Sequence, residues 1–391
     1  MKKGIVTADW HIDFNNRMVD TETRIAEVVD YAIEKKVDFF AFVGDAYKNC
    51  RPMPVEQEVF QSAIRRVAQA GIQVLLIVGN HDYPNSEDQI HCLSEWTTLD
   101  IKGVRVVDKP EYVDIGADEH GKYFALCMPH IPKSIVGKRK YGEVYKEMWD
   151  VLWKEYKCSQ NSGDNDKTQN VIFLSHALLN GSKLGATDWA IGQGDGVNIR
   201  DVLDGRGQDI QMALFGDVHK AQKISNPPYA GYCGSIERID FGEIADKKGF
   251  YYVELRNGAE KIEFINTKAT EFVEVVGTIE TALPTREICT WVDQAKVDNA
   301  IVKVVVTATE EQRKNINDAV VHRFIVTRGA RKIASYQVNV VSTERVRNEN
   351  VNESVNPIEA LKEWVGMQPD ISQEKKENII KTGEKILRSV K

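Results

Sequence analysis

Residues Ile72-Gln73-Val74-Leu75-Leu76-Ile77-Val78 are almost all apolar, and they run directly into the polar sequence Gly79-Asn80-His81-Asp82. A short apolar run that stops at a turn signal is typical of a strand buried inside a protein. Polar residues that follow such a strand lie at its carboxyl end, where open α/β sheets bind their ligands. We therefore expect residues 79–82 to belong to a functional site at one edge of a sheet.

The same arrangement occurs four more times along the chain. Apolar strands are expected at about 5–8, 39–43, 171–175 and 212–215. The polar residues at their ends are Asp9-Trp10-His11, Gly44-Asp45, Ser175-His176 and Gly216-Asp217-Val218-His219. Stretches with helical spacing follow the first two strands, at about 21–36 and 55–70. Strands that alternate with helices predict an α/β layer fold whose strands are buried.

Seven oxygen and nitrogen donors stand at these strand ends: Asp9, His11, Asp45, Asn80, His176, Asp217 and His219. A single polar residue there is more often a cap than a ligand, but five ordered motifs are hard to attribute to chance. A carboxylate can bridge two metal ions, and two ions about 3.5–4 Å apart can clamp a phosphoryl group. Imidazole and carboxylate donors without thiolate suit Mn²⁺, Fe or Zn²⁺ better than Ca²⁺. The motifs therefore predict a two-metal site.

The composition is that of an ordinary globular protein. The chain has 391 residues, of which 42% are hydrophobic and 28% charged, and this excludes collagen-like, wholly disordered and disulfide-scaffold chains. Six cysteines without a C-x-x-C pair predict reduced thiols and a cytoplasmic location. We expect neither a membrane span nor a signal peptide. The net charge of −7 arises in residues 1–269, which hold 33 Lys and Arg against 40 Asp and Glu, and bound cations would offset part of it.

The ordered motifs resemble those of the calcineurin-like metallophosphoesterases, and the chain resembles their SbcD branch, a meiotic-recombination-type nuclease subunit. The segments similar to that branch are 44–52, Lys220-Ala221-Gln222, Gly234-Ser235-Ile236-Glu237-Arg238-Ile239-Asp240-Phe241-Gly242-Glu243 and Gly249-Phe250. The resemblance is strong over most of residues 3–267. It implies a two-sheet metallophosphoesterase sandwich flanked by helices, with a small α+β capping domain and a C-terminal helical segment.

Carried onto matching positions, the resemblance implies two divalent ions, Mn²⁺ ahead of Mg²⁺. The first would be held by Asp9, His11, Asp45 and His219, and the second by Asp45, Asn80, His176 and Asp217. His81 would be the general acid that protonates the leaving sugar oxygen, and Asp82 would orient the His81 ring. The alternative for His81 is a structural role within its own turn.

Two positions depart from the family pattern. Asp217 stands where the branch usually has histidine, and this third carboxylate leaves the metal centre one unit less positive. A less positive centre acidifies its bound water less, which predicts a preference for the harder ions Mn²⁺ or Mg²⁺. Lys48 stands where family members often place a histidine thought to steer DNA, and a lysine can contact phosphate as a point charge.

Three parts are expected along the chain: a phosphoesterase (nuclease) core at 1–269, a capping domain at 270–343, and a linker with a helical pair at 344–391. Strands at 301–307 and 335–341 around a helix at about 310–323 suggest a β-α-β module in the second part. Apolar residues at helical spacing predict two short amphipathic helices in the third part. The resemblance implies that these helices dock an SbcC-type coiled-coil ATPase.

The candidate DNA contacts are the basic residues Lys48, Arg51, Arg139, Lys140 and Arg328. Basic runs are most often solvated faces, but beside a phosphodiesterase site they become plausible phosphate contacts. The acidic net charge predicts weak, salt-sensitive DNA binding by the isolated protein. The resemblance implies that the ATPase contributes to DNA binding and that the chain forms a homodimer.

The resulting hypothesis is an Mn²⁺-dependent DNA exonuclease and endonuclease that acts at DNA ends with an SbcC-type ATPase, in double-strand-break repair or recombination. Two alternatives stay open. One is a small-substrate metallophosphatase or cyclic-nucleotide phosphodiesterase, against which Arg51-Pro52 and the segment 234–243 argue. The other is a weakly active DNA-end scaffold, which Asp217 and Lys48 motivate.

Overall fold

The computed structural model describes residues 1–84, 90–161, 169–184, 196–206, 209–256, 261–341, 356–368 and 371–389. Its first sheet has the strand order β12-β11-β1-β2-β3-β4. The strands are β1 (Lys2–Thr7), β2 (Phe39–Val43), β3 (Gln73–Ile77), β4 (Val104–Val107), β11 (Gly249–Leu255) and β12 (Lys261–Asn266). β1 to β4 pair in parallel, and β11 and β12 add an antiparallel edge. Parallel pairing brings the polar ends of β1, β2 and β3 to one edge of the sheet.

The second sheet has the strand order β5-β6-β7-β8-β10-β9. Its strands are β5 (Glu111–Asp118), β6 (Gly121–Met128), β7 (Gln169–His176), β8 (Ile210–Gly216), β9 (Gln222–Ser225) and β10 (Tyr229–Tyr232). β6, β7, β8 and β10 are parallel, so β7 and β8 end at the same edge. Three short helical turns lie in connections of the two sheets: α3 (Ser94–Leu99) between β3 and β4, α4 (Lys133–Val136) after β6, and the 3-10 turn η1 (Phe241–Glu243) before β11.

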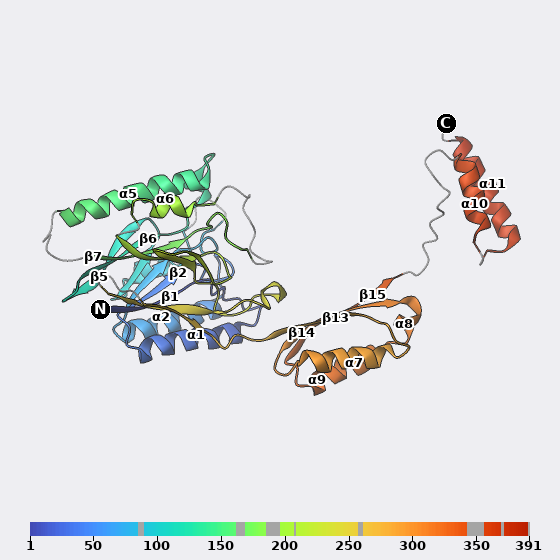
Figure 1. Ribbon diagram of the computed structural model, residues 1–391, viewed down its shortest axis with the longest axis horizontal. Coiled ribbons are helices and arrows are strands. Elements are labelled where there is room, and N and C mark those ends of the chain that lie inside the picture. Colours follow the sequence, from blue (N-terminus) through green and yellow to red (C-terminus); the bar gives the residue numbers. More distant parts are fainter. Residues whose placement is uncertain are drawn as a thin grey trace.

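The two sheets pack face to face over a fully buried core, with Ala41 and Leu75 on one side and Leu174 and Leu214 on the other. Helices α1 (Met18–Glu34) and α2 (Pro54–Gln69) cover the outer face of the first sheet, and α5 (Tyr141–Asn161) and α6 (Ile199–Leu203) cover that of the second (Figure 1). Each fully buried aliphatic or phenyl side chain stabilises this packing by about 1.5–3 kcal/mol. The expected two-sheet sandwich flanked by helices is confirmed.

A third, all-parallel sheet has the strand order β13-β14-β15. Its elements are β13 (Phe272–Thr278), α7 (Pro284–Ala295), β14 (Ile301–Thr309), α8 (Glu310–Lys314), α9 (Asp318–Thr327) and β15 (Lys332–Val341). The single helix expected at 310–323 is wrong, because Asn317 caps a new helix by accepting a hydrogen bond from the Val320 backbone N–H at 3.2 Å. Arg331 ion-pairs with Asp20 of α1, which ties β15 to the first sheet's helical layer.

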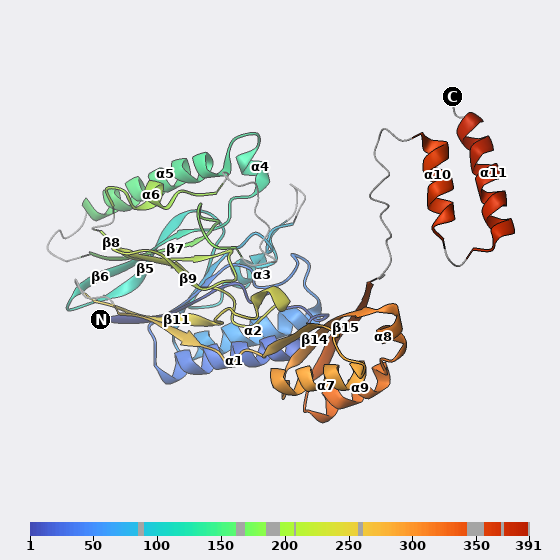
Figure 2. The same cartoon turned by 45° about the vertical axis from the view of Figure 1, so that its right-hand side comes forward.

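The last described elements are α10 (Pro357–Gly366) and α11 (Gln373–Ser389), joined by an ion pair of 2.6 Å between Lys362 and Glu384. The two helices stand apart from the three sheets in both views (Figure 2). Most of the expected linker, residues 344–355, lies outside the described residues. The polar stretch expected to form a loop from residue 158 instead continues α5 to Asn161. In the described part of the chain, each helix is too short or too polar to span a bilayer.

Candidate metal centre

The seven predicted donors meet where the strands of both sheets end. β1 leads to Asp9 and His11, β2 to Asp45, β3 to Asn80, β7 to His176, and β8 to Asp217 and His219. Asp9, His11, Asp45, His176 and His219 are all buried. The sandwich therefore brings side chains that lie up to 210 positions apart in the sequence (Asp9 and His219) into one neighbourhood.

The backbone around these donors is closely tied together and locally strained. The Asp9 N–H donates to the Gly44 carbonyl at 3.0 Å, and the His11 N–H donates to the Asp45 carbonyl at 3.1 Å. In the described residues, nine non-glycine positions have a positive φ, and four of them are predicted ligands: Asp9 (54°), His11 (43°), Asp45 (62°) and Asp217 (94°). Such a conformation costs on the order of 1–3 kcal/mol and persists where the surroundings impose it, often at functional sites.

The first donor cluster consists of Asp9, His11 and His219 together with Asp45. Ligand atoms of Asp9, His11 and His219 lie within 4.8 Å of one another, and the Nε2 atoms of His11 and His219 are 2.9 Å apart. His11 Nε2 is 3.5 Å from Asp45 Oδ2. The buried Asp9 Oδ2 has no hydrogen-bond partner in the described part of the chain, although a buried charge of this kind is costly. A cation among these atoms would satisfy it.

The second donor cluster consists of Asp45, Asn80, His176 and Asp217. The side-chain amide of Asn80 lies 2.8 Å from His176 Nε2, 3.2 Å from Asp45 Oδ2 and 3.1 Å from Asp217 Oδ1. His176 Nδ1 donates to the Val43 carbonyl at 2.7 Å, which directs the Nε2 lone pair toward the cluster. Two carboxylates, an imidazole and an amide that converge in this way suit a second ion.

The electrostatics show how strongly this cluster needs positive charge. Burial raises the pKa of Asp9 to about 7, although His176 and His219 oppose that shift. Burial disfavours the charged form of His176, but Asp45, Asp217 and Asp9 together hold its pKa well above its ordinary value. Burial and the neighbouring His219 lower the pKa of His11 well below its ordinary value. Protons bound at Asp9 and His176 therefore occupy sites that divalent ions would take over.

His81 lies beside the clusters, and its ring meets the ring of His11 edge to face at 4.8 Å between centroids. The backbone N–H of His81 donates to Asp45 Oδ1 at 2.9 Å, and its Nδ1 lies 2.9 Å from the Lys48 carbonyl. Donation from Nδ1 to that carbonyl fixes the ring and leaves Nε2 for proton exchange. The position is thus compatible with the acid role expected for His81.

The expected role of Asp82 needs correction, because its carboxylate is used elsewhere. Its two oxygens accept the backbone N–H groups of Gly79 at 2.8 Å, Asp45 at 3.0 Å and Ala46 at 3.1 Å. Burial raises the pKa of Asp82 to about 6. The backbone carbonyl of Lys48, not the carboxylate of Asp82, orients the His81 ring. Asp82 instead connects the loop after β3 to the loop after β2.

The sequence matches the calcineurin-like phosphoesterase family over residues 3–221, which is more than half of the chain. The chain belongs to this family. Phosphoesterases of this family use a two-metal centre, and the paired donor clusters fit one.

Two relatives carry informative names. The phosphoesterase is 25% identical over 285 residues to the DNA double-strand break repair protein Mre11 of Haloferax volcanii, covering 70% of this chain and 55% of that protein. It is 22% identical over 285 residues to the SbcD subunit of the SbcCD nuclease from Staphylococcus epidermidis, covering 70% and 72%. The chain thus spans little more than half the length of the archaeal relative. A crystal structure of a dimetal phosphatase from Danio rerio is similar with a TM-score of 0.43 at 9% identity, covering 68% of this chain and 96% of that one.

Two glycines of the motifs make room for the donors. A Cβ on Gly79 would lie 2.2 Å from Asp45 Oδ1 and 2.4 Å from the Asp45 backbone nitrogen. A Cβ on Gly44, whose φ is +92°, would lie 2.1 Å from His176 Nδ1. Because neither contact is possible, glycine at both positions is needed for the strand ends to approach this closely.

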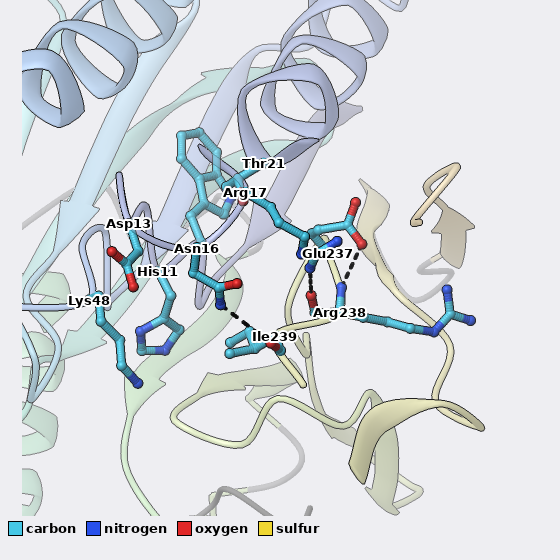
Figure 3. Close-up of a pocket in the computed structure, with 10 residues that line it drawn as sticks. His11, Asp13, Asn16, Arg17, Thr21, Lys48, Glu237, Arg238 and Ile239 are labelled. Carbon is cyan, nitrogen blue, oxygen red and sulfur yellow. Dashed lines mark hydrogen bonds between the residues drawn. The ribbon is translucent and has the colours of Figure 1, made fainter. Parts of the chain in front are cut away.

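A small pocket opens beside His11, and its lining includes Asn16, Arg17, Lys48 and Glu237 (Figure 3). The side chain of Lys48 extends alongside the His11 ring, and its positive charge contributes to the lowered pKa of His11. Arg17 is held by Asp20 and by the Arg238 carbonyl. Lys48 thus places a cation next to the first donor cluster.

The other candidate DNA contacts lie on the surface. Arg139 pairs with Glu147 at 2.6 Å, and Arg328 pairs with Asp293 at 2.6 Å. Arg51 and Lys140 are exposed. Of the five candidates, all within the described residues, Lys48 alone lines the pocket beside His11.

Sequence reasoning missed two residues near the donors. Glu243 accepts a hydrogen bond from His219 Nδ1 at 3.1 Å, and its pKa is about 2 because His219 and Lys248 outweigh the effect of burial. His130 stacks on Tyr141 with ring centroids 5.7 Å apart, and burial together with His176 lowers the pKa of His130 to about 3. Glu243 is the last residue of the segment 234–243, which is similar to the SbcD branch, so the sequence pointed to this position without indicating its function. His130 belongs to none of the motifs.

Proposed function

We propose that this phosphoesterase is an Mn²⁺-dependent nuclease that hydrolyses DNA phosphodiester bonds, as an exonuclease and an endonuclease at DNA ends. The proposal is carried by the two donor clusters that share Asp45, with His81 beside them. The names of the two relatives, a double-strand break repair protein and a nuclease subunit, support DNA as the substrate and repair or recombination as the process.

In this proposal, Asp9, His11, Asp45 and His219 hold one ion, and Asp45, Asn80, His176 and Asp217 hold the other. The ions would neutralise phosphate charge and supply an activated water at neutral pH. Nε2 of His81 holds the proton that passes to the leaving sugar oxygen, while Nδ1 stays bonded to the Lys48 carbonyl. Asp82 keeps the loops that carry Asp45 and His81 at a fixed separation.

The preference for Mn²⁺ follows from charge and donor type. Asp9, Asp45 and Asp217 supply three carboxylates, and Asn80 adds a neutral oxygen. Such an oxygen-rich set suits a hard ion, and the histidines favour Mn²⁺ over Mg²⁺. The wild-type protein is therefore expected to be most active with Mn²⁺.

An assay on end-labelled DNA tests the proposal. Wild type is expected to cleave single-stranded and duplex DNA with Mn²⁺ and not after chelation. His81→Asn should lower the rate by about 10²–10⁴-fold while both ions still bind, because only proton delivery is removed. His120→Asn, at an exposed histidine paired with Glu119, is the matched control.

Two results would contradict a DNA nuclease. Faster turnover of a small phosphodiester dye than of DNA would support the small-substrate alternative. Metal-bound wild type that cleaves neither substrate would support the scaffold alternative.

Lys48 is proposed to contact substrate phosphate, with Arg51, Arg139, Lys140 and Arg328 as weaker surface contacts. Lys48→Gln should raise KM for DNA and reduce its salt dependence with little change in kcat. Lys102→Gln, which changes an exposed lysine after α3, provides the control.

The helical pair α10–α11 is proposed to dock an SbcC-type coiled-coil ATPase. Trp364 is 49% exposed and Ile386 is 56% exposed, and Leu361, Ile379 and Ile386 line an open groove between the helices. An apolar groove of this kind fits a helix of a partner.

A deletion tests the docking. Removing residues 350–391 should abolish binding of an SbcC-type ATPase and spare Mn²⁺-dependent cleavage. Ile379→Asp should act in the same direction, while Lys381→Asp on the exposed polar side should not. ATPase binding by the deletion variant would contradict the assignment.

The chain is further proposed to form a homodimer in the cytoplasm. All six cysteines are free thiols, as a reducing compartment favours. Light scattering on the purified protein would test the dimer, for which a mass of about 88 kDa is twice the 44.2 kDa of the chain.

A further inference from the structure

A buried charge cluster stands directly behind His219. Glu243 Oε1 is 3.1 Å from His219 Nδ1, and Glu243 Oε2 is 2.9 Å from Lys248 Nζ. The same ammonium donates to the His219 carbonyl at 3.1 Å and to Ser235 Oγ at 2.8 Å. The side chains of Glu243 and Lys248 are 1% and 0% exposed. Lys248 thus joins the backbone of His219 to the carboxylate that holds the His219 ring.

This arrangement selects one tautomer of His219. When Nδ1 carries the proton and donates it to Glu243, the lone pair on Nε2 is left for the donor cluster, where Nε2 faces His11. The second oxygen of Glu243 also accepts the Ile239 backbone N–H at 2.8 Å. Glu243 is therefore fixed by three partners, and a buried carboxylate with so many partners is costly to remove.

The turn that carries Glu243 also contacts the third sheet. Phe241 begins η1 and packs on Phe272 of β13, with ring centroids 4.8 Å apart. Lys303 of β14 places its ammonium 5.7 Å from the Phe241 ring centroid. The three-residue turn η1 therefore has a contact with the third sheet at its first residue, Phe241, and at its last residue, Glu243, the hydrogen bond that orients His219.

We propose that Glu243 is the positioning residue of the first metal site and that Lys248 holds Glu243 in place. Through the packing of Phe272 on Phe241, the position of the third sheet also affects the geometry of this site. The proposal deepens the proposed function and rests on its two-metal centre. A ligand-orienting partner of this kind changes metal affinity or activity by about 10–100-fold when it is replaced. The second donor cluster does not contain His219, so replacing Glu243 should change its metal affinity little.

Metal titration of Glu243→Gln tests the positioning role. We expect one of two Mn²⁺ ions to bind about 10–100-fold more weakly, with loss of the spin-coupled signal of an Mn²⁺ pair in electron paramagnetic resonance. Glu287→Gln is the matched control, because that carboxylate likewise accepts several hydrogen bonds, from Glu280 and Thr281, but belongs to the third-sheet region. Wild-type affinity for both ions in Glu243→Gln would overturn the proposal.

A measurement on the metal-free protein separates positioning from general destabilisation. Nitrogen-15 spectra of the histidine rings should show His219 protonated at Nδ1 in wild type and in Glu287→Gln, and a mixture of tautomers in Glu243→Gln. Should Glu243→Gln not fold, the double variant Glu243→Gln/Lys248→Met removes both charges together and is expected to show the same weakened ion. An unchanged tautomer in the folded variant would overturn the positioning role.

The link to the third sheet has its own test. Phe241→Ala should weaken the first ion several-fold, whereas Phe264→Ala, which truncates a half-buried ring packed on Tyr251, should not. Equal effects of the two variants would overturn the transmission step. A wild type that binds two ions with this dependence on Glu243 but leaves DNA intact would contradict the nuclease and uphold the positioning role.

Discussion

The two donor clusters share Asp45 but differ in depth and in chemistry. In the first, His11 and His219 have side chains only 1% and 10% exposed, and Glu243 supports His219 from behind. In the second, Asp217 is 23% exposed and the amide of Asn80 takes the place of an imidazole. The comparison shows a site with two imidazoles, one of them supported by Glu243, beside a site with one imidazole and a partly exposed Asp217. A change of metal preference is therefore expected mainly at the second cluster.

Removing the shared ligand should have the largest effect. Asp45→Ala deprives both clusters of a carboxylate, so both ions should be lost and hydrolysis should fall by at least about 10³-fold. Metal analysis of the purified variant and the end-labelled DNA assay check this. One ion retained at full affinity would show that Asp45 does not bridge the clusters.

Without metal, the first cluster should carry a cost that depends on pH. The pKa of Asp9 in the folded protein, about 7, lies above its unfolded value of 3.8, so the folded state binds the extra proton and loses stability as pH rises from about 4 to 7. Metal-free Asp9→Asn should thus be more stable than wild type by on the order of 2–4 kcal/mol at pH 8, and the difference should shrink toward pH 4.

Urea unfolding with a chelator at pH 5 and pH 8 measures this difference, with Asp30→Asn as an exposed control. Mn²⁺ at 1,000 times its Kd should remove this advantage, because the ion that Asp9 helps to hold then stabilises wild type by about 4.1 kcal/mol. A metal-free Asp9→Asn that is less stable than wild type at pH 8 would contradict the assigned burial cost.

Single-ligand variants should separate the two clusters. His219→Ala should weaken one ion about 100-fold and leave the other, and Asn80→Ala should weaken the opposite one by a smaller factor, because it removes a neutral ligand. Calorimetric titration with Mn²⁺ checks both variants. Equal loss of both ions in either variant would mean that the clusters form one indivisible site.

The smallest expected effect is a change in which metal ions support activity, caused by a substitution in the second donor cluster. Asp217→His removes one carboxylate and makes the centre more positive, so the ratio of activity with Zn²⁺ to activity with Mn²⁺ should rise several-fold. Rates with Mn²⁺, Mg²⁺ and Zn²⁺ at saturating concentration measure it. An identical profile would show that Asp217 does not set metal preference.

The convergence of the seven side chains could be predicted from the sequence because each follows an apolar strand, and strand ends of a parallel sheet meet at one edge. The strand pattern alone could not predict that β7 and β8 belong to a second sheet facing the first, since that depends on packing between distant segments, and only the family resemblance implied two sheets. The role of Asp82 was wrong for a related reason: its partners are backbone N–H groups of residues about 36 positions away, which no side-chain pattern records. Glu243 and Lys248 were missed because buried ion pairs far from the motifs look like ordinary surface residues in a sequence.

Asp82 has a consequence for how this protein acquires its ions. Its carboxylate joins the loops after β2 and β3 through backbone hydrogen bonds that involve no metal ligand atom, so the spacing of the two loops does not require an ion. Ions bound there would then leave and return without remodelling of these two loops. The occupancy of the pocket would follow the supply of divalent cations in its surroundings, and catalytic output would rise and fall with that supply.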